Sequence, residues 1–313
     1  MTADDMGHDI SGRRVLVTGG AGFIGAALVD ALVNANDVCV LDDFSTGERE
    51  RVHADATLIE GDIRDGSTVE TAMEGVDLVF HQAGLVSVPE STKRPVDSQS
   101  ANVGGTVRLL DAARREDARV VVASSAAVYG HPETVPVPED AALSPTSPYG
   151  VDKLAVDHYT RLFADLYDLP TVALRYFNVY GPNQPDSGYS GVVSTFLEQA
   201  LSGSPVTVHG DGTQTRDFVH VDDVVRANLL AAETDAVGRA FNVGSGTETS
   251  IQELAETVTS VVDTDSDVVH VDGRAGDIEH SVANLEAAKR SLGYQPQVTL
   301  ADGLPTVVDA DVE

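Results

Sequence analysis

The sequence predicts an α/β fold, a doubly wound parallel sheet with a smaller C-terminal α/β lobe. Through the first half of the chain, short apolar runs alternate with amphipathic stretches, which is the pattern of parallel strands connected by helices. A glycine-rich turn follows the first of these runs, where a strand would lead into a helix. Beyond Gly181 the alternation gives way to a Pro- and Gly-rich loop at 181–191 and to shorter elements, which indicates a second lobe.

The expected elements follow one another in a regular order. Apolar runs predict strands at residues 14–18, 38–41, 57–60, 78–81, 119–124 and 171–175. Apolar residues at helical spacing predict helices between them at 24–33, 67–73, 103–115 and 149–167.

These elements assign residues 1–180 to the wound sheet, and the segment at about 217–245 is expected to return to it. Residues 181–313 are assigned mainly to the second lobe. No internal repeat or low-complexity linker separates the two parts, so we expect them to pack directly and form a cleft.

Charge and composition limit the classes of function. The 313 residues include 20 basic Lys and Arg against 50 acidic residues, a net charge of −30. Nucleic acid is therefore not expected as a partner, because phosphate binding needs a basic surface. No apolar run reaches the ~20 residues of a membrane span and the acidic start lacks the features of a secretory signal, so we expect a cytoplasmic protein without membrane association. The scattered acidic residues indicate adaptation to concentrated salt.

No metal site is expected. The single cysteine, Cys39, lies in an apolar run and is interpreted as a core residue. None of the nine histidines forms a metal-spaced set. The acidic pairs Asp42-Asp43 and Asp222-Asp223 could each bind a cation. A contact with a ribose explains the first pair better, and a favourable charge at a helix N-terminus explains the second.

The turn at residues 18–25 indicates a Rossmann-like dinucleotide site. Gly19, Gly22 and Gly25 are spaced as G-x-x-G-x-x-G between an expected strand and an expected helix. Such a turn needs unusual backbone angles, and a phosphate that approaches the helix N-terminus needs a backbone without Cβ in the way. A plain turn would have the same glycines, so the interpretation depends on this context.

Asp42 indicates which dinucleotide is bound. It closes the second expected strand about 20 residues after the turn, where a carboxylate can hydrogen-bond the ribose hydroxyls of the adenosine half. A 2′-phosphate would be repelled there, and no arginine lies within residues 42–47 to receive it. We therefore expect NAD rather than NADP. A carboxylate that only caps the loop is the alternative for Asp42.

Tyr149 and Lys153 form a candidate acid/base pair. They are four positions apart, so they lie on one face of the expected helix. A free tyrosine has a pKa of about 10, and a nearby cation favours its phenolate. The spacing Y-x-x-x-K also occurs by chance on solvated helix faces. Ser125 strengthens the catalytic interpretation, because it ends an apolar run where a strand opens into the cofactor crevice.

Together these motifs resemble the extended short-chain dehydrogenases over essentially the whole chain, and specifically their NAD-dependent epimerase/dehydratase branch. RYFNVYGP and RDFVHVDD are far more specific to that branch than the glycine turn. The matching segments lie at 18–25, 62–63, 81–84, 102, 124–125, 149–153, 175–182 and 216–220. The NAD-binding residues that the resemblance implies are Gly19, Gly22, Phe23, Ile24, Gly25, Asp42, Asp43, Phe44, Ser45, Thr46, Gly47, Asp62, Ile63, Gln82, Ala83, Gly84, Asn102, Tyr149, Lys153 and Tyr176.

One position separates the reactions of this branch. In the branch that this chain resembles, dehydratases need an acid and a base at the two positions directly after the catalytic Ser/Thr. Decarboxylases of the same branch usually keep a glutamate at the second of these positions. This chain has Ala126-Ala127 there, and alanine cannot move a proton. The implied reaction is 4-epimerisation of a UDP-hexose, N-acetylated or not, through a transient 4-keto sugar. Two alternatives remain open: a net reductase or dehydrogenase of a nucleotide sugar or small carbonyl, and a catalytically inert NAD-binding regulator.

The resemblance also implies a sugar-nucleotide site and an assembly. Arg216 and Arg274 match diphosphate-binding arginines, and His209 stands where relatives place an aromatic ring against uracil, with a surface-turn histidine as the alternative. A homodimer through helices at 103–115 and 151–167 is likewise implied. The implied substrate-binding residues are Ser125, Tyr149, Asn178, His209, Arg216, Arg274 and Ser281.

Two residues depart from the pattern of some relatives. Val86 replaces a lysine that reaches the cofactor, which removes that contact. Ser281 replaces a bulky tyrosine beside the sugar 2-substituent, and its small side chain would leave room for an N-acetyl group.

Overall fold

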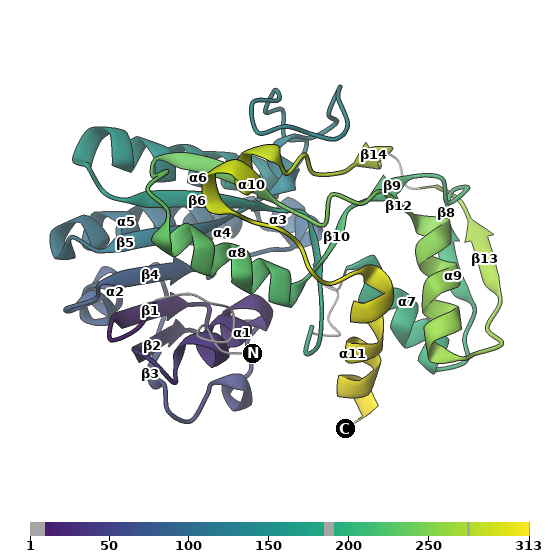
Figure 1. The fold of residues 1–313 in the computed structure, drawn as a ribbon, viewed down its shortest axis with the longest axis horizontal. Coiled ribbons are helices and arrows are strands. Elements are labelled where there is room, and N and C mark those ends of the chain that lie inside the picture. The colour runs from purple at the N-terminus through teal and green to yellow at the C-terminus, as the bar shows by residue number, and fades with distance from the viewer. Residues whose placement is uncertain (1–9, 185–190, 274–275, 313) are drawn as a thin grey trace.

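The computed structural model describes residues 10–184, 191–273 and 276–312 and confirms the α/β class (Figure 1). Seven parallel strands form the main sheet in the order β11-β6-β5-β4-β1-β2-β3. The chain builds outward from β1 in one direction and then from β4 in the other, so the order reverses between β1 and β4. The strands are β1 Arg14–Thr18, β2 Asp37–Asp42, β3 Thr57–Glu60, β4 Leu78–His81, β5 Arg119–Ser125, β6 Thr171–Tyr176 and β11 Arg239–Val243.

Helices cover both faces of this sheet. Val15 and Val17 of β1 belong to the core shared with α1 and α8, whereas Leu16 belongs to the core shared with α2, α5 and α6. Strands buried on both faces have continuous apolar runs, which is why the sequence marks them clearly. The helices are α1 Phe23–Leu32, α2 Gly66–Met73, α3 Val88–Lys93, α4 Pro95–Gln99, α5 Gly105–Glu116, α6 Pro148–Tyr167, α8 Val221–Glu233 and α10 Glu286–Leu292.

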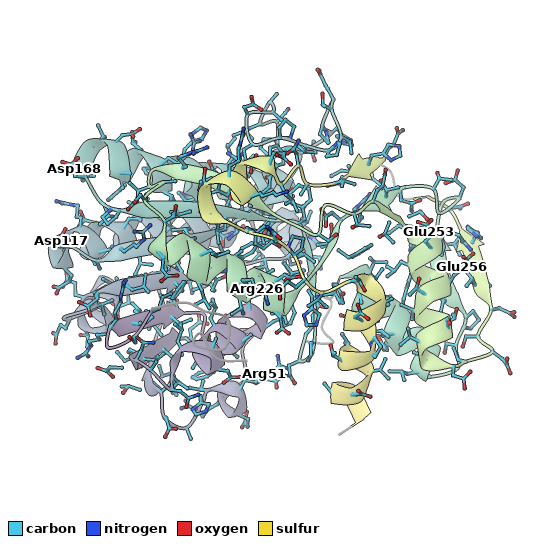
Figure 2. All side chains as sticks on the ribbon, viewed as in Figure 1. Arg51, Asp117, Asp168, Arg226, Glu253 and Glu256 are labelled. Carbon is cyan, nitrogen blue, oxygen red and sulfur yellow. The ribbon has the colours of Figure 1, made fainter. Side chains whose placement is uncertain are left out.

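Short helical turns and left-handed caps complete this part of the chain. A π-helical turn, Ser100–Gly104, leads into α5, and the 3-10 turns η1 Arg49–Arg51 and η3 Ala126–Val128 follow β2 and β5. Asp117 and Asp168, labelled in Figure 2, end α5 and α6 with φ of 56° each. Aspartate tolerates this conformation better than most residues, so it ends both helices at low cost.

The second lobe lies beside the sheet in Figure 1, where α7, α9 and α11 group together around a core of their own. Between its two parts the chain returns to the main sheet, since α8 packs on β5 and β6 and β11 pairs with β6. The remaining elements are β7 Asn178–Tyr180, α7 Val192–Leu201, β8 Val206–His209, β9 Thr215–Arg216, β10 Phe218–His220, β12 Thr249–Ser250, α9 Ile251–Val262, β13 Val268–Val271, β14 His280–Ser281 and α11 Leu300–Val312. None of the helices that the structure describes is long and apolar enough to cross a membrane.

A buried ion pair ties α6 to β6. The Arg175 guanidinium donates to both carboxylate oxygens of Asp157, at 2.8 and 3.1 Å. It also donates to the Tyr129 hydroxyl and the Glu139 carbonyl, both at 2.8 Å. Arg175 is 2% exposed and Asp157 is fully buried. Because both charges are desolvated, each depends on the other.

Arg175→Met is expected to lower the free energy of unfolding by about 3 kcal/mol, because it leaves the Asp157 carboxylate buried without its bidentate partner. Arg49→Met is the matched control, since Arg49 pairs with Glu60 at the surface and exposed pairs contribute about 0–1 kcal/mol. Urea unfolding followed by circular dichroism measures both values. Equal losses in the two variants would contradict the role assigned to the buried pair.

Candidate active site

A cavity of about 530 Å³ opens where the strand order of the main sheet reverses. Its walls come from the turn after β1, the ends of β2, β4 and β5, the start of α6 and the link from β6 to β7. The sequence-predicted residues that line it are Gly19, Gly22, Phe23, Ile24, Gly25, Asp42, Asp43, Ser45, Thr46, Asp62, Ile63, Gln82, Ala83, Gly84, Ser125, Tyr149, Lys153, Tyr176 and Asn178.

The glycine turn leaves no room for side chains. Gly19 has φ +70°, and a Cβ there would lie 2.7 Å from the backbone nitrogen of Ala83. A Cβ on Gly25 would lie 2.0 Å from the Gly19 carbonyl oxygen. Gly22 is the N-cap of α1, and no side chain in the described part of the chain caps that helix end. The start of α1 therefore presents free backbone N–H groups and the positive end of a helix dipole to the cavity, which suits a diphosphate.

Asp42 joins the turn to the end of β2. Its carboxylate accepts hydrogen bonds from the backbone nitrogens of Ala21 and Phe44, both at 2.9 Å. Burial raises the pKa of Asp42, and these two hydrogen bonds oppose that shift. The loop-capping role considered as an alternative is thus present, and the residue lines the cavity as well.

Arg64 is a cavity residue that the sequence analysis missed. Its Nε donates to both carboxylate oxygens of Asp62, at 2.9 and 2.8 Å. This ion pair lowers the pKa of Asp62 and holds it as a carboxylate. Arg64 directly follows the matched segment at 62–63, so its position in the sequence was a usable signal.

Ser125, Tyr149 and Lys153 all line the cavity. Ser125 ends β5, whereas Tyr149 and Lys153 lie on the first turns of α6. The Lys153 ammonium donates to the Ala123 carbonyl at 2.8 Å and lies 5.9 Å from the centroid of the Tyr149 ring. The Ser147 hydroxyl accepts from the Gly150 nitrogen at 3.1 Å and fixes the start of the helix.

Burial shifts both titrating groups toward their neutral forms. It raises the pKa of Tyr149, and a hydrogen bond from Ser125 opposes this shift. It lowers the pKa of Lys153 to about 8. A further positive charge in the cavity would therefore favour the phenolate of Tyr149.

Three predicted cofactor residues support the cavity wall from behind. Phe44 donates its backbone N–H to Asp42, and a Cβ on Gly47 would lie 2.9 Å from the Ala21 carbonyl. Asn102 is buried, and its side-chain oxygen accepts from the Leu85 nitrogen at 2.8 Å. These three residues do not line the cavity itself.

Three predicted substrate residues that the structure describes, His209, Arg216 and Ser281, do not line this cavity. Arg216 and Ser281 are register partners on β9 and β14 of the second lobe. The Arg216 guanidinium is engaged by the Ile278 carbonyl, at 2.7 Å, and by the Asp277 carboxylate, and burial lowers its pKa. The half-buried His209 ends β8, with Nδ1 3.2 Å from the Asp272 carbonyl. Arg274 lies outside the described residues.

The segment that includes α3 and α4 was missed altogether. Its helices are too short to show apolar periodicity, although the Ser87 cap and the prolines near the helix starts were local signals. Val86, where some relatives have a lysine, lines the cavity and is 53% exposed. The other cavity residues that were not predicted are Leu41, Gly61, Leu85, Arg94, Asp97, Ala101, Ala123, Ser124, Phe177, Val179, Gln184 and Gly191.

No group of three or more His, Cys, Asp or Glu residues is placed to hold a metal ion in residues 10–184, 191–273 and 276–312.

Lys153→Met is expected to raise the free energy of unfolding of the NAD-free protein at pH 7. The folded pKa of Lys153 is about 8 and its unfolded value is about 10.5, so below pH 8 the wild type carries the full cost of a buried charge. Between pH 8 and pH 10.5 the unfolded chain binds more protons than the folded protein, so the free energy of unfolding of the wild type increases as the pH rises. The difference in stability between Lys153→Met and the wild type therefore becomes smaller. Urea unfolding of both proteins at pH 7 and pH 10 measures the difference. A difference that is the same at both values would contradict the lowered pKa.

Comparison with known proteins identifies the family. The sequence profile of the NAD dependent epimerase/dehydratase family matches residues 15–244. A UDP-glucose 4-epimerase of Mycolicibacterium smegmatis is 39% identical, and the match covers 95% of this chain and 97% of that protein.

Two solved structures have the same fold throughout. The UDP-N-acetylglucosamine 4-epimerase of Methanobrevibacter ruminantium, in complex with UDP-N-acetylmuramic acid, has a TM-score of 0.93 at 35% identity, covering 97% of this chain and 99% of its own. The UDP-glucose 4-epimerase of Thermotoga maritima, with UDP-glucose, has a TM-score of 0.92 at 37% identity, covering 96% and 98%. Since the profile spans most of the chain and the relatives align with it almost end to end, the chain belongs to the NAD-dependent epimerase/dehydratase family.

Proposed function

We propose that the protein is an isomerase that catalyses the NAD-dependent 4-epimerisation of a UDP-hexose through a transient 4-keto sugar. One observation carries the reaction type: Ser125, Tyr149 and Lys153 meet in the cavity, and the residues directly after Ser125 are Ala126 and Ala127. An elimination of water would need an acid and a base there. The similarity to UDP-sugar 4-epimerases supports the same reaction.

The cavity fits NAD. We infer that residues 1–180, completed by about 217–245, hold the cofactor, with its diphosphate at the start of α1 and a ribose at Asp42. Asp62 and Ile63 would hold the adenine, and Lys153 the nicotinamide ribose. The glycines that leave the α1 backbone uncovered are the feature that fits this ligand. When bound, NAD supplies a hydride acceptor that can return the hydride to the same carbon.

Tyr149 is the proposed acid/base group. As a phenolate it takes the proton from the sugar 4-hydroxyl, and it returns that proton when the sugar 4-oxygen is reduced again. Ser125 holds the 4-oxygen by a hydrogen bond. The hydrogen bond with Ser125 lowers the pKa of Tyr149 against the effect of burial. The positive charges of Lys153 and of oxidised nicotinamide would favour the phenolate further. The keto sugar turns its other face to the cofactor between the two transfers, so the configuration at C4 inverts.

The second lobe is the proposed sugar-nucleotide side. We assign the diphosphate to Asn178, Arg216 and Arg274, and the uracil to His209. Since Arg216 is engaged by Asp277, the substrate must replace that carboxylate. Ser281, the register partner of Arg216, would leave space at the sugar 2-substituent.

A homodimer, a cytoplasmic location and adaptation to salt belong to the same proposal. Helix α6 exposes Val151, Tyr159, Leu162 and Leu166, and an exposed apolar stripe of this kind favours a helix-to-helix contact. The net charge of −30 supports solubility in concentrated salt, where self-repulsion is screened.

Tyr149→Phe is expected to lower kcat by about 10³ with little change in KM, because it removes the proton acceptor and keeps the ring. Tyr159→Phe, on the exposed side of the same helix, is the control and should keep wild-type activity. Conversion of UDP-glucose to UDP-galactose is followed without added NAD, since an epimerase regains its cofactor in each cycle. Wild-type turnover only with added NAD or NADH would instead indicate a net redox enzyme.

Ser281→Tyr is expected to reduce kcat/KM for UDP-N-acetylglucosamine by about 10-fold or more, with a smaller effect on UDP-glucose, because a bulky ring fills the space for the acetamido group. Incubation with UDP-glucose, UDP-galactose, their N-acetyl forms and UDP-glucuronate, followed by separation of the epimers, measures this. A wild type that is inactive on both N-acetylated epimers and active on UDP-glucose would contradict the role given to Ser281.

A further inference from the structure

Lys153 is a buried cation in the wall of the cavity. The residue is 5% exposed, and its ammonium donates to the Ala123 carbonyl. Within residues 10–184, 191–273 and 276–312, no carboxylate forms an ion pair with it. A buried ammonium is costly unless negative charge lies near it.

Asp152, the residue before Lys153, is a buried anion. It is 5% exposed and points to α4 and the π-helical turn before α5. The Ser98 hydroxyl donates to its Oδ2 at 2.5 Å, and the Asn102 side-chain nitrogen donates to the same oxygen at 3.4 Å. In the described part of the chain it has no cationic contact. Asp152 and Lys153, consecutive residues of α6, are therefore buried opposite charges, and neither forms an ion pair within the described residues.

Asn102 fixes Asp152 relative to the cavity wall. Its side chain accepts from the Leu85 nitrogen at 2.8 Å and donates to the Leu85 carbonyl at 3.1 Å. Leu85 lines the cavity. A buried, hydrogen-bonded network of this kind holds its charge at a fixed place.

The other groups around Lys153 do not supply this charge. His81 of β4 is held between the hydroxyls of Thr18 and Thr106, at 2.7 and 2.8 Å, and burial lowers its pKa to about 3, so it is neutral. Asp157, one turn further along α6, is already paired with Arg175 and Arg161. Ser125, Tyr149 and Tyr176, which line the same cavity as Lys153, carry hydroxyl groups and no carboxylate.

We propose that Asp152 is a positioning residue whose carboxylate is the counter-charge of Lys153 and keeps that lysine protonated beside Tyr149. This inference rests on the proposed function. With oxidised NAD bound and Tyr149 as phenolate, the site holds the positive charges of Lys153 and the nicotinamide and the negative charges of Tyr149 and Asp152, which cancel. Without Asp152 the site has one net positive charge, which favours loss of a proton from Lys153. The field of Asp152 raises the pKa of Lys153 against the lowering effect of burial.

The lysine content of the chain makes a direct test possible. The sequence has lysine only at 93, 153 and 289. Lys93 and Lys289 are both exposed. Protein labelled with ¹³C-lysine therefore gives few Cε signals by NMR, and the missing signal in Lys153→Met assigns the buried one. Titration of the NAD-free protein then reads the pKa of Lys153 without substrate or turnover.

Asp152→Asn is expected to lower the pKa of Lys153 from about 8 by about one unit, the size of a unit charge acting across a partly shielded interior. Ser98→Ala, which removes a hydrogen bond and keeps the charge, should change it by a few tenths of a unit at most. An unchanged pKa of Lys153 in folded Asp152→Asn would overturn the proposal. If that variant does not fold, Asp152→Ser removes the same charge with a smaller side chain.

The pH dependence of kcat provides a second test. In Asp152→Asn the alkaline limb of the kcat profile should move to lower pH in step with the pKa of Lys153, and in Ser98→Ala it should stay in place. A limb that does not move with the measured pKa would overturn the link to the reaction. If the wild type has no epimerase activity, the proposed function is contradicted, but the measured pKa of Lys153 still tests the role of Asp152. Failure of the proposed function and failure of this inference can therefore be distinguished.

Discussion

The close approach of the glycine turn to the ends of β2 and β4 is the constraint on which the rest of the structure depends. Gly19 lies so near Ala83 that no Cβ fits between them, and Asp42 accepts from the backbone of Ala21 in the same turn. The turn is thereby locked to both neighbouring strands, and the start of α1 is left uncovered. A site for an anionic cofactor follows from packing alone, before any side chain contacts the ligand.

The second requirement is a fixed α6, because this helix carries both titrating groups. The Ser91 hydroxyl of α3 accepts from the Tyr149 backbone nitrogen at 3.1 Å, one of the N–H groups that a helix start leaves without a partner. Further along, the Asp157 carboxylate is clamped by Arg175 of β6. The helix is thus held at its start and its middle by two different elements, and the 5.9 Å geometry between Lys153 and the Tyr149 ring is a product of both.

The sequence was informative where the signal is local. The expected strands of the main sheet were visible because burial on both faces demands continuous apolar runs, and Tyr149 and Lys153 because a helix brings residues four apart together. The wall from α3 and α4 was not predictable, since very short helices have no periodicity to detect. The cavity position of Arg94 in that wall, and the location of Arg216 outside the cavity, depend on how distant segments pack, which no local pattern encodes.

The contact between Arg216 and Asp277 has a consequence for affinity. In its proposed role, Arg216 would give up this internal carboxylate before it binds a diphosphate, so the measured affinity would be the difference between two ion pairs rather than the strength of one. The same exchange would assist release, because Asp277 could replace the departing anion. An internal carboxylate that competes with the ligand in this way would lower its affinity and speed its release, without any change in the residues proposed to perform the chemistry.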